Sequence, residues 1–251
     1  MSYKGAIRRL VEKLTGTKIK VYRVQPRGID PFEDLVNDLP KLRVQTVFDV
    51  GANTGQSAES FLRRFPDSTI YCFEPAEDTF RQLQSAFHTD DRVSCFRLAM
   101  SSTKGTGKMV LDERPDMRYL AKPSSPGEAA PATGLEDVGT ETVDGFCADR
   151  GIDRIDFLKI DTEGHDLEVL KGTVRLLASQ CVDVVEVEAG MNIENKRHIG
   201  FADLDGFLQE RGYFLFGIYE QVSEWPTHRP HLRRTNPIYI SRRVLEANPT
   251  N

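Results

Sequence analysis

The sequence contains no uninterrupted apolar run of the roughly 18 residues that a membrane-spanning helix requires. Its N-terminus also lacks the apolar core of a signal peptide. Basic residues are not in excess, since 33 Lys and Arg stand against 38 Asp and Glu. The resulting net charge of −5 gives no electrostatic footprint for a polyanion. We therefore expect a cytoplasmic protein with no integral membrane segment and no nucleic-acid partner.

Cysteine is scarce, and its spacing excludes the usual structural zinc sites. No Cys-x-x-Cys pair or Cys/His spacing of a zinc site occurs in the sequence. Three of the cysteines lie in or beside strand-like segments, where a thiol behaves as a small apolar residue. We expect reduced and mostly buried thiols at the four positions, Cys72, Cys95, Cys147 and Cys181.

The segment from Val47 to Gly55 is the most informative stretch of the chain. An apolar run ends in a glycine-punctuated turn, and residues 56–65 then place apolar side chains on one helical face. A strand, tight turn and helix in this order present backbone N–H groups and a helix N-terminus to a bound nucleotide. The next strand-like run, 69–73, ends in Glu74, and an acid there can accept two hydrogen bonds from a ribose diol. The pattern predicts a nucleoside site.

The rest of the chain alternates helix-like and strand-like segments. We expect helices over residues 32–39, 77–87, 142–150 and 201–211, and strands over 93–100, 155–160, 182–187, 213–219 and 237–241. Between them, residues 101–140 are rich in Gly and Pro and are either an acceptor-recognition loop or a surface insertion. The basic loop expected over residues 220–236 contains Trp225, which could stack on a sugar, and arginines that could hold an anionic acceptor.

An amphipathic basic helix is predicted for residues 1–14. It could cover the cofactor pocket, pair with a second subunit in a homodimer, or contact an anionic membrane surface. Packing on its own domain is the simplest interpretation. We assign residues 1–43 to an N-terminal helical extension, and residues 44–251 to one domain that carries the 101–140 loop insertion.

Acidic residues gather where two central strands are expected to end. Asp161 follows the apolar run 155–160, and Glu188 follows the run 182–187. Carboxyl ends of parallel strands face the ligand crevice, so Asp161, Glu163 and Glu188 could together bind Mg²⁺. Alternatively, Asp161 or His165 could act directly as general base. For Glu163 and His165, an acidic helix start is the competing structural interpretation.

Three ordered motifs resemble one known family. Asp49-x-Gly51-x-Asn53-x-Gly55, Phe73-Glu74-Pro75 and Lys159-Ile160-Asp161-Thr162-Glu163-Gly164 are similar to motifs of the FkbM-type methyltransferases, which use S-adenosylmethionine (SAM). The resemblance implies an α/β, Rossmann-like, seven-stranded class I methyltransferase fold, mostly parallel with an antiparallel last strand. It also implies SAM as cofactor and O-methylation of a hydroxyl on a sugar, glycan or glycosylated metabolite.

The resemblance further implies roles for individual residues. Glu74 would bind the ribose diol, and Asp161 would lead catalysis or metal binding, with His165 and Glu188 as the other catalytic candidates. The methionine and ribose side of the cofactor would be shaped by Asp49, Gly51, Asn53, Thr54 and Gly55, and the adenine side by Ala99 and Ser101. The alternatives are a nicotinamide-dependent oxidoreductase or epimerase and a non-catalytic SAM-binding protein, although the sequence lacks Gly-x-Gly-x-x-Gly and Tyr-x-x-x-Lys.

Overall fold

The computed structural model describes residues 26–112, 118–121 and 134–249. The basic helix predicted for residues 1–14 lies outside them. The first described helix, α2, spans Pro31–Asp38. It begins there because the Asp30 carboxylate accepts hydrogen bonds from two backbone N–H groups of the first turn, and Pro31 occupies the first helical position.

The central sheet has seven main strands in the order β3-β2-β1-β8-β9-β12-β11, and the short β10 also pairs with β12. Neighbours among the first five run parallel, whereas β12 runs antiparallel to both β9 and β11. The predicted mostly parallel sheet with an antiparallel last strand is therefore confirmed. The strands are β1 (Thr46–Val50), β2 (Thr69–Phe73), β3 (Val93–Phe96), β8 (Ile155–Ile160), β9 (Val182–Val187), β10 (Ala189–Gly190), β11 (Tyr213–Glu224) and β12 (Arg229–Ser241).

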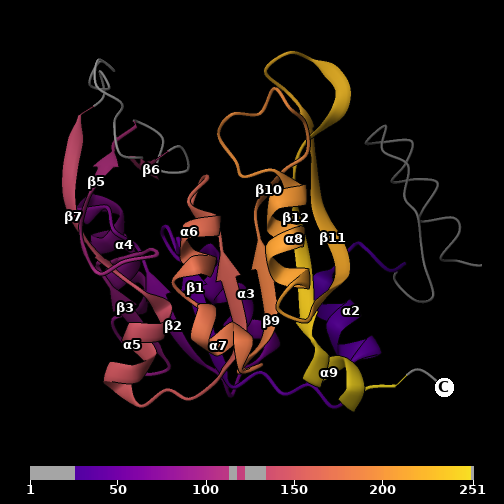
Figure 1. Cartoon of the computed structure of the whole chain (residues 1–251). Coiled ribbons are helices and arrows are strands. Elements are labelled where there is room, and N and C mark those ends of the chain that lie inside the picture. Colours follow the sequence, from indigo (N-terminus) through magenta and orange to yellow (C-terminus); the bar gives the residue numbers. More distant parts are fainter. Residues whose placement is uncertain (1–25, 113–117, 122–133, 250–251) are drawn as a thin grey trace, which may run out of the picture.

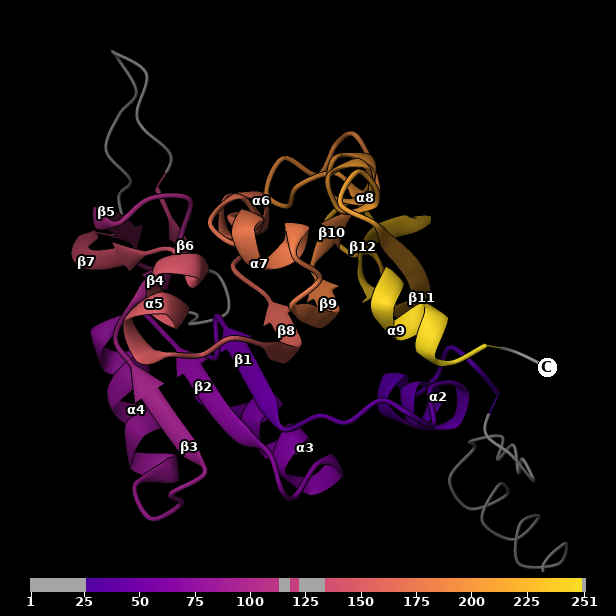
Figure 2. The same ribbon diagram turned by 60° about the horizontal axis from the view of Figure 1, so that its bottom comes forward.

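Helices cover both faces of the central sheet (Figures 1 and 2). One buried cluster joins the sheet to α5, α6, α7 and α8, and another joins the opposite face to α2, α3, α4 and α9. This explains why β8 and β9 are buried along their whole length and read as predominantly apolar runs, with two charged residues in each. The remaining helices are α3 (Gln56–Arg64), α4 (Glu77–Phe87), α5 (Val143–Arg150), α6 (Asp166–Lys171), α7 (Val174–Ala178), α8 (Phe201–Gln209) and α9 (Arg242–Ala247).

A second, smaller sheet corrects the prediction of a loop over residues 101–140 where the structure describes them; residues 113–117 and 122–133 of that segment lie outside the described part of the chain. Figure 1 shows this sheet at the upper left, near α4. Its strands lie in the order β4-β7-β5-β6, and the predicted strand 93–100 is split because its last two residues leave β2 and pair with β7. The bounds are β4 (Ala99–Met100), β5 (Gly105–Val110), β6 (Tyr119–Leu120) and β7 (Leu135–Glu141).

The loop predicted for residues 220–236 is also wrong in part. Strands β11 and β12 continue through most of it as an antiparallel hairpin with several register shifts. The outer part of the hairpin is largely exposed on both faces, so it needs no apolar alternation and gives no strand-like pattern. Among the described helices, none is long and apolar enough to cross a bilayer.

Candidate active site

A cavity of about 390 Å³ opens where β1, β2, β8 and β9 end at their carboxyl edge. This is the position at which doubly wound sheets bind ligands, because the strand order reverses there. It is lined by Val50, Gly51, Ala52, Asn53, Gln56, Ser57, Phe73, Glu74, Pro75, Leu98, Ala99, Met100, Met109, Arg118, Leu120, Lys159, Asp161, Thr162, Glu163, His165, Glu188 and Arg234.

The glycine turn after β1 forms one wall, but its two glycines serve the protein's own packing. Gly51 has φ +82°, and a Cβ there would lie 1.8 Å from the carbonyl oxygen of Asp161. At Gly55 a Cβ would meet the ring of Phe87 at 2.3 Å. Gly51 and Asn53 line the cavity, whereas Gly55 and Thr54 do not. Gly55 thus allows α3 to pack on α4, not a close approach of the ligand.

Glu74 closes β2 and lies on the cavity wall, as the ribose hypothesis requires. One carboxylate oxygen accepts the N–H of Asn53 at 3.1 Å, and the other accepts the N–H of Ala76 at 2.9 Å. Burial raises its pKa to about 7, although these two hydrogen bonds oppose the rise. Each oxygen retains a lone pair that can accept a further hydrogen bond from a ligand.

The second sheet supplies much of the apolar wall. Ala99 of β4 lines the cavity as predicted, and it is joined by Met109 of β5 and Leu120 of β6. Arg118 also reaches this wall; it pairs with Asp78 and donates to Thr79 Oγ1 at 2.8 Å. The sequence analysis missed these three because they belong to the segment interpreted as a loop.

His165 lines the cavity, and Ser101 stands behind it. Their side chains meet at 2.9 Å between Ser101 Oγ and His165 Nε2. Ser101 therefore lies outside the predicted adenine wall and orients the imidazole instead.

Buried charge lies beneath the cavity. Asp49 and Lys159 stand opposite each other in register on β1 and β8, with Asp49 Oδ1 3.9 Å from Lys159 Nζ. Asp49 is fully buried and does not line the cavity. Burial raises its pKa to about 6, while the charge of Lys159 acts in the opposite direction. Asp49 is therefore placed as a support for Lys159, not as a residue of the predicted methionine wall.

Lys159 pairs chiefly with Asp161, the predicted catalytic carboxylate. Asp161 Oδ2 accepts from Lys159 Nζ at 3.0 Å. Burial would raise the pKa of Asp161, but Lys159 outweighs it and holds this pKa below its ordinary value. Asp161 is thus ionised at neutral pH, lines the cavity and is held in one orientation from behind.

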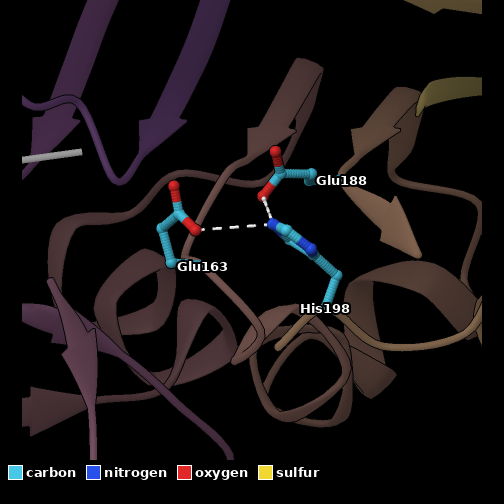
Figure 3. Close-up of side chains that lie close together, drawn as sticks. All are labelled: Glu163, Glu188 and His198. Atoms are coloured by element: carbon cyan, nitrogen blue, oxygen red, sulfur yellow. Dashed lines mark ion pairs between the residues drawn. The ribbon is translucent and has the colours of Figure 1, made fainter. Parts of the chain in front are cut away.

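Glu163 and Glu188 come together, but with His198 in place of the predicted Asp161 (Figure 3). His198 Nε2 lies 3.4 Å from Glu163 Oε2 and 3.0 Å from Glu188 Oε2. Burial would lower the pKa of His198, but the two carboxylates raise it to about 9. The cluster thus differs in one member from the metal set predicted from the sequence, since Asp161 pairs with Lys159 and His198 meets the two glutamates.

Two further side chains hold this acidic corner in place. Asp166 is fully buried, accepts the N–H of Glu188 at 3.0 Å and accepts from Thr162 Oγ1 at 2.8 Å. It thereby joins the turn after β8 to the end of β9. Arg234 lines the cavity and pairs with Glu188 Oε1 at 2.7 Å.

Of the residues in the 220–236 segment that were predicted to bind an acceptor, only Arg234 lines the cavity. Trp225 is 53% exposed and does not line the cavity, and its ring lies 5.6 Å from the guanidinium carbon of Arg233. Arg233 pairs with Glu224, and Arg229 pairs with Glu194. These arginines therefore already have acidic partners within the protein.

Comparison with known proteins supports the resemblance seen in the sequence. The model of the methyltransferase FkbM domain matches residues 49–215. A hexuronic acid methyltransferase, AglP of Haloferax volcanii, is 28% identical in an alignment of 155 residues that covers 58% of this chain and 57% of the relative. A 2-O-methyltransferase, NoeI of Sinorhizobium fredii, is 24% identical in an alignment of 136 residues that covers 50% of this chain and 56% of the relative. The chain thus spans little more than half the length of these relatives.

The fold agrees with a solved structure of the same family. Methyltransferase FkbM from Methylobacillus flagellatus superposes with a TM-score of 0.53 and 15% sequence identity, covering 84% of this chain and 48% of that one. At this identity the likeness shows the fold alone, whereas the family model covers all three motifs from Asp49 to Gly164. The chain therefore belongs to the FkbM family of methyltransferases.

Proposed function

We propose that this protein is a SAM-dependent O-methyltransferase that methylates a hydroxyl of a sugar, glycan or glycosylated metabolite. The observation that carries the proposal is one cavity that combines two kinds of wall. Gly51, Asn53 and Glu74 form a nucleoside-type wall, and Asp161 stands across the cavity floor beside further acids. Cofactor and acceptor could therefore meet above the ends of β1 and β8.

The cofactor would lie along the turn after β1 and the end of β2. The Glu74 carboxylate has acceptor capacity left for the two ribose hydroxyls, and the apolar side chains of Leu98, Ala99 and Met100 suit the adenine face. SAM would supply an electrophilic methyl group on a sulfonium. The acids on the cavity wall favour this cation electrostatically.

Methyl transfer to a hydroxyl is an in-line displacement. The acceptor oxygen forms a bond to the methyl carbon, the carbon–sulfur bond breaks with its electron pair going to sulfur, and the hydroxyl proton leaves to a base. The protein must therefore align the acceptor, receive a proton and exclude water. Asp161 is placed for the first two tasks because it faces the cavity as an ionised carboxylate.

His165 is the alternative base, and the pH dependence of kcat at saturating SAM separates the two. A His165 base predicts a kcat that falls at acidic pH as the imidazole gains a proton. An Asp161 base predicts no such fall, because Lys159 holds the pKa of Asp161 below its ordinary value of 3.8.

A sugar acceptor is supported by the relatives, one described as a hexuronic acid methyltransferase and another as a 2-O-methyltransferase. The sequence predicts that arginines of the segment 220–236 bind an anionic acceptor, and Arg234 is the arginine of that segment on the cavity wall. It could contact an acceptor carboxylate while still paired with Glu188. Mg²⁺, the cation expected from the sequence, would favour the all-carboxylate set of Asp161, Glu163 and Glu188; in that set Asp161 would share its carboxylate between the ion and Lys159.

The test is S-adenosylhomocysteine release from SAM with a panel of hexuronic acid glycosides and matched neutral glycosides. We expect acceptor-dependent release by the wild type and at least about 100-fold less by Asp161→Asn, as loss of a general base predicts. SAM binding without release on any acceptor would favour a non-catalytic SAM-binding protein. Binding of NAD⁺ with no binding of SAM would favour the oxidoreductase alternative.

A further inference from the structure

Glu163, Glu188 and His198 reach one point from three separate segments. Glu163 lies in the turn after β8, Glu188 follows β9, and His198 lies in the segment that leads to α8. That segment packs directly on the turn after β8: a Cβ on Gly164 would lie 2.0 Å from the carbonyl oxygen of Arg197. One ligand atom from each of the three side chains lies within 4.8 Å of the other two.

Two of the three spacings between these atoms match the coordination shell of a metal ion. For metal–ligand bonds of about 2.1 Å, neighbouring ligand atoms lie about 3.0 Å apart in an octahedron and about 3.4 Å apart in a tetrahedron. The distances from His198 Nε2 are 3.0 Å to Glu188 Oε2 and 3.4 Å to Glu163 Oε2. Figure 3 shows both carboxylates directed toward the same imidazole nitrogen.

One of these atoms has an incomplete set of hydrogen-bond partners. Glu188 is 2% exposed, and within the described part of the chain its Oε2 makes no hydrogen bond of good geometry. Its contact with His198 Nε2 at 3.0 Å is an ion pair only when the imidazole is protonated, and a buried carboxylate oxygen that meets no cation or donor is costly. Because Oε2 is directed into the cluster, a bound metal ion could take the place of the imidazole proton.

Each candidate ligand is also held by a second layer of side chains. Asn195 lies against the other imidazole nitrogen, with Oδ1 3.1 Å and Nδ2 2.8 Å from His198 Nδ1. Arg234 pairs with Glu188 Oε1, and Arg197 Nε donates to Glu163 Oε2 at 2.5 Å. Outer partners of this type fix the orientation of metal ligands.

We propose that Glu163, Glu188 and His198 bind a first-row transition-metal dication such as Mn²⁺ or Zn²⁺. The imidazole nitrogen decides the class of metal, since Mg²⁺ prefers an all-oxygen shell and nitrogen donors favour transition metals. Glu163 and Glu188 line the cavity whereas the buried His198 does not. Three protein ligands would leave further coordination positions open toward the acceptor.

The role of such an ion rests on the proposed function. An acceptor hydroxyl coordinated through an open position would be oriented, and its pKa would be lowered, before it attacks the methyl group. The competing structural interpretation is a charged imidazolium that bridges two carboxylates and binds no metal.

The test is calorimetric titration of metal-stripped protein with MnCl₂, ZnCl₂ and MgCl₂. We expect one Mn²⁺ or Zn²⁺ site per chain, at least 10-fold tighter than any Mg²⁺ site, and at least 10-fold weaker in Glu163→Gln and His198→Gln. The matched control is His88→Gln, which removes an exposed imidazole far from the cavity and should leave binding unchanged. Circular dichroism checks that each variant is folded. If His198→Gln does not fold, the metal affinity of Glu163→Gln alone tests the site, because Glu163 is partly exposed and its replacement disturbs the core less.

Absence of saturable binding to the wild type would overturn the site, as would binding that Glu163→Gln leaves unchanged. The proposed function fails in a different way. Metal binding without methyl transfer would leave the site intact and contradict the transferase assignment. Methyl transfer by a protein that binds no cation would overturn the site alone.

Discussion

Replacement of Glu74 by Gln tests the nucleoside wall of the cavity. The carboxylate already accepts the N–H groups of Asn53 and Ala76, and its remaining lone pairs would accept the ribose hydroxyls. The amide of glutamine keeps one acceptor oxygen, but its NH₂ group would face the N–H of Asn53 or Ala76 and could not accept a hydrogen bond from it. One charge-assisted hydrogen bond to the ligand is lost, which is worth about 1.5–3 kcal/mol.

That free energy corresponds to SAM binding that is roughly 10- to 150-fold weaker, measured by titration calorimetry. The matched control is Glu77→Gln, the same substitution three residues later on a side chain that is 44% exposed and outside the cavity wall. It should change SAM affinity by less than about twofold. Unchanged affinity in a correctly folded Glu74→Gln protein would refute the assignment of Glu74 to the ribose.

Glu74 also predicts how binding and stability depend on pH. Burial raises its pKa from 4.5 to about 7. SAM affinity should therefore rise with pH up to about 7 as the carboxylate forms, and Glu74→Gln should flatten this rise. In the ligand-free protein, the raised pKa contributes stability that is complete below pH 4.5 and is lost as the pH rises through about 7. Urea unfolding of both proteins from pH 4 to 8 measures the difference.

Three further changes have defined outcomes. Asp161→Asn should bind SAM within about threefold of wild type and lose turnover, so unchanged turnover would exclude Asp161 as the base. Gly51→Ala should lower the free energy of unfolding by about 2 kcal/mol or more, because φ is +82° and its Cβ would lie 1.8 Å from a carbonyl oxygen. The control Gly206→Ala, within α8 and with nothing within 4 Å of its Cβ, should raise stability by about 0.5–1 kcal/mol. Trp225→Ala should change stability by less than about 0.5 kcal/mol; a raised KM with unchanged kcat would show that it contacts the acceptor.

The central sheet was predictable because its strands are buried on both faces, so that each strand is a short, mostly apolar run in the local sequence. β8 and β9 are predominantly apolar runs that are followed by acids, so both the strands and the position of Asp161 follow from local sequence. The carboxyl ends of parallel strands lie at one edge of a sheet, so the sequence also predicted that Glu163 and Glu188 lie close enough to share a metal ion.

The residues that were missed depend on contacts between distant segments. His198 has neither a strand end nor a motif beside it, and only the packing of its segment on the turn after β8 brings it to the two glutamates. Leu120 lies in the short edge strand β6 and Arg118 directly precedes that strand, in a polar, Pro-rich segment where no periodicity reveals pairing. Lys159 could have been suspected, because a lysine within an otherwise apolar central strand requires an acidic partner.

The most direct test of the account is transfer from SAM carrying a ¹³C-labelled methyl group to a hexuronic acid glycoside, followed by NMR of the product. We expect a methyl ether that survives mild base, formed in equal amount to S-adenosylhomocysteine and absent with Asp161→Asn. A base-labile methyl ester would show transfer to the carboxylate instead of a hydroxyl. That result, or SAM binding with no labelled product from any sugar acceptor, would contradict O-methylation as the function of this cavity.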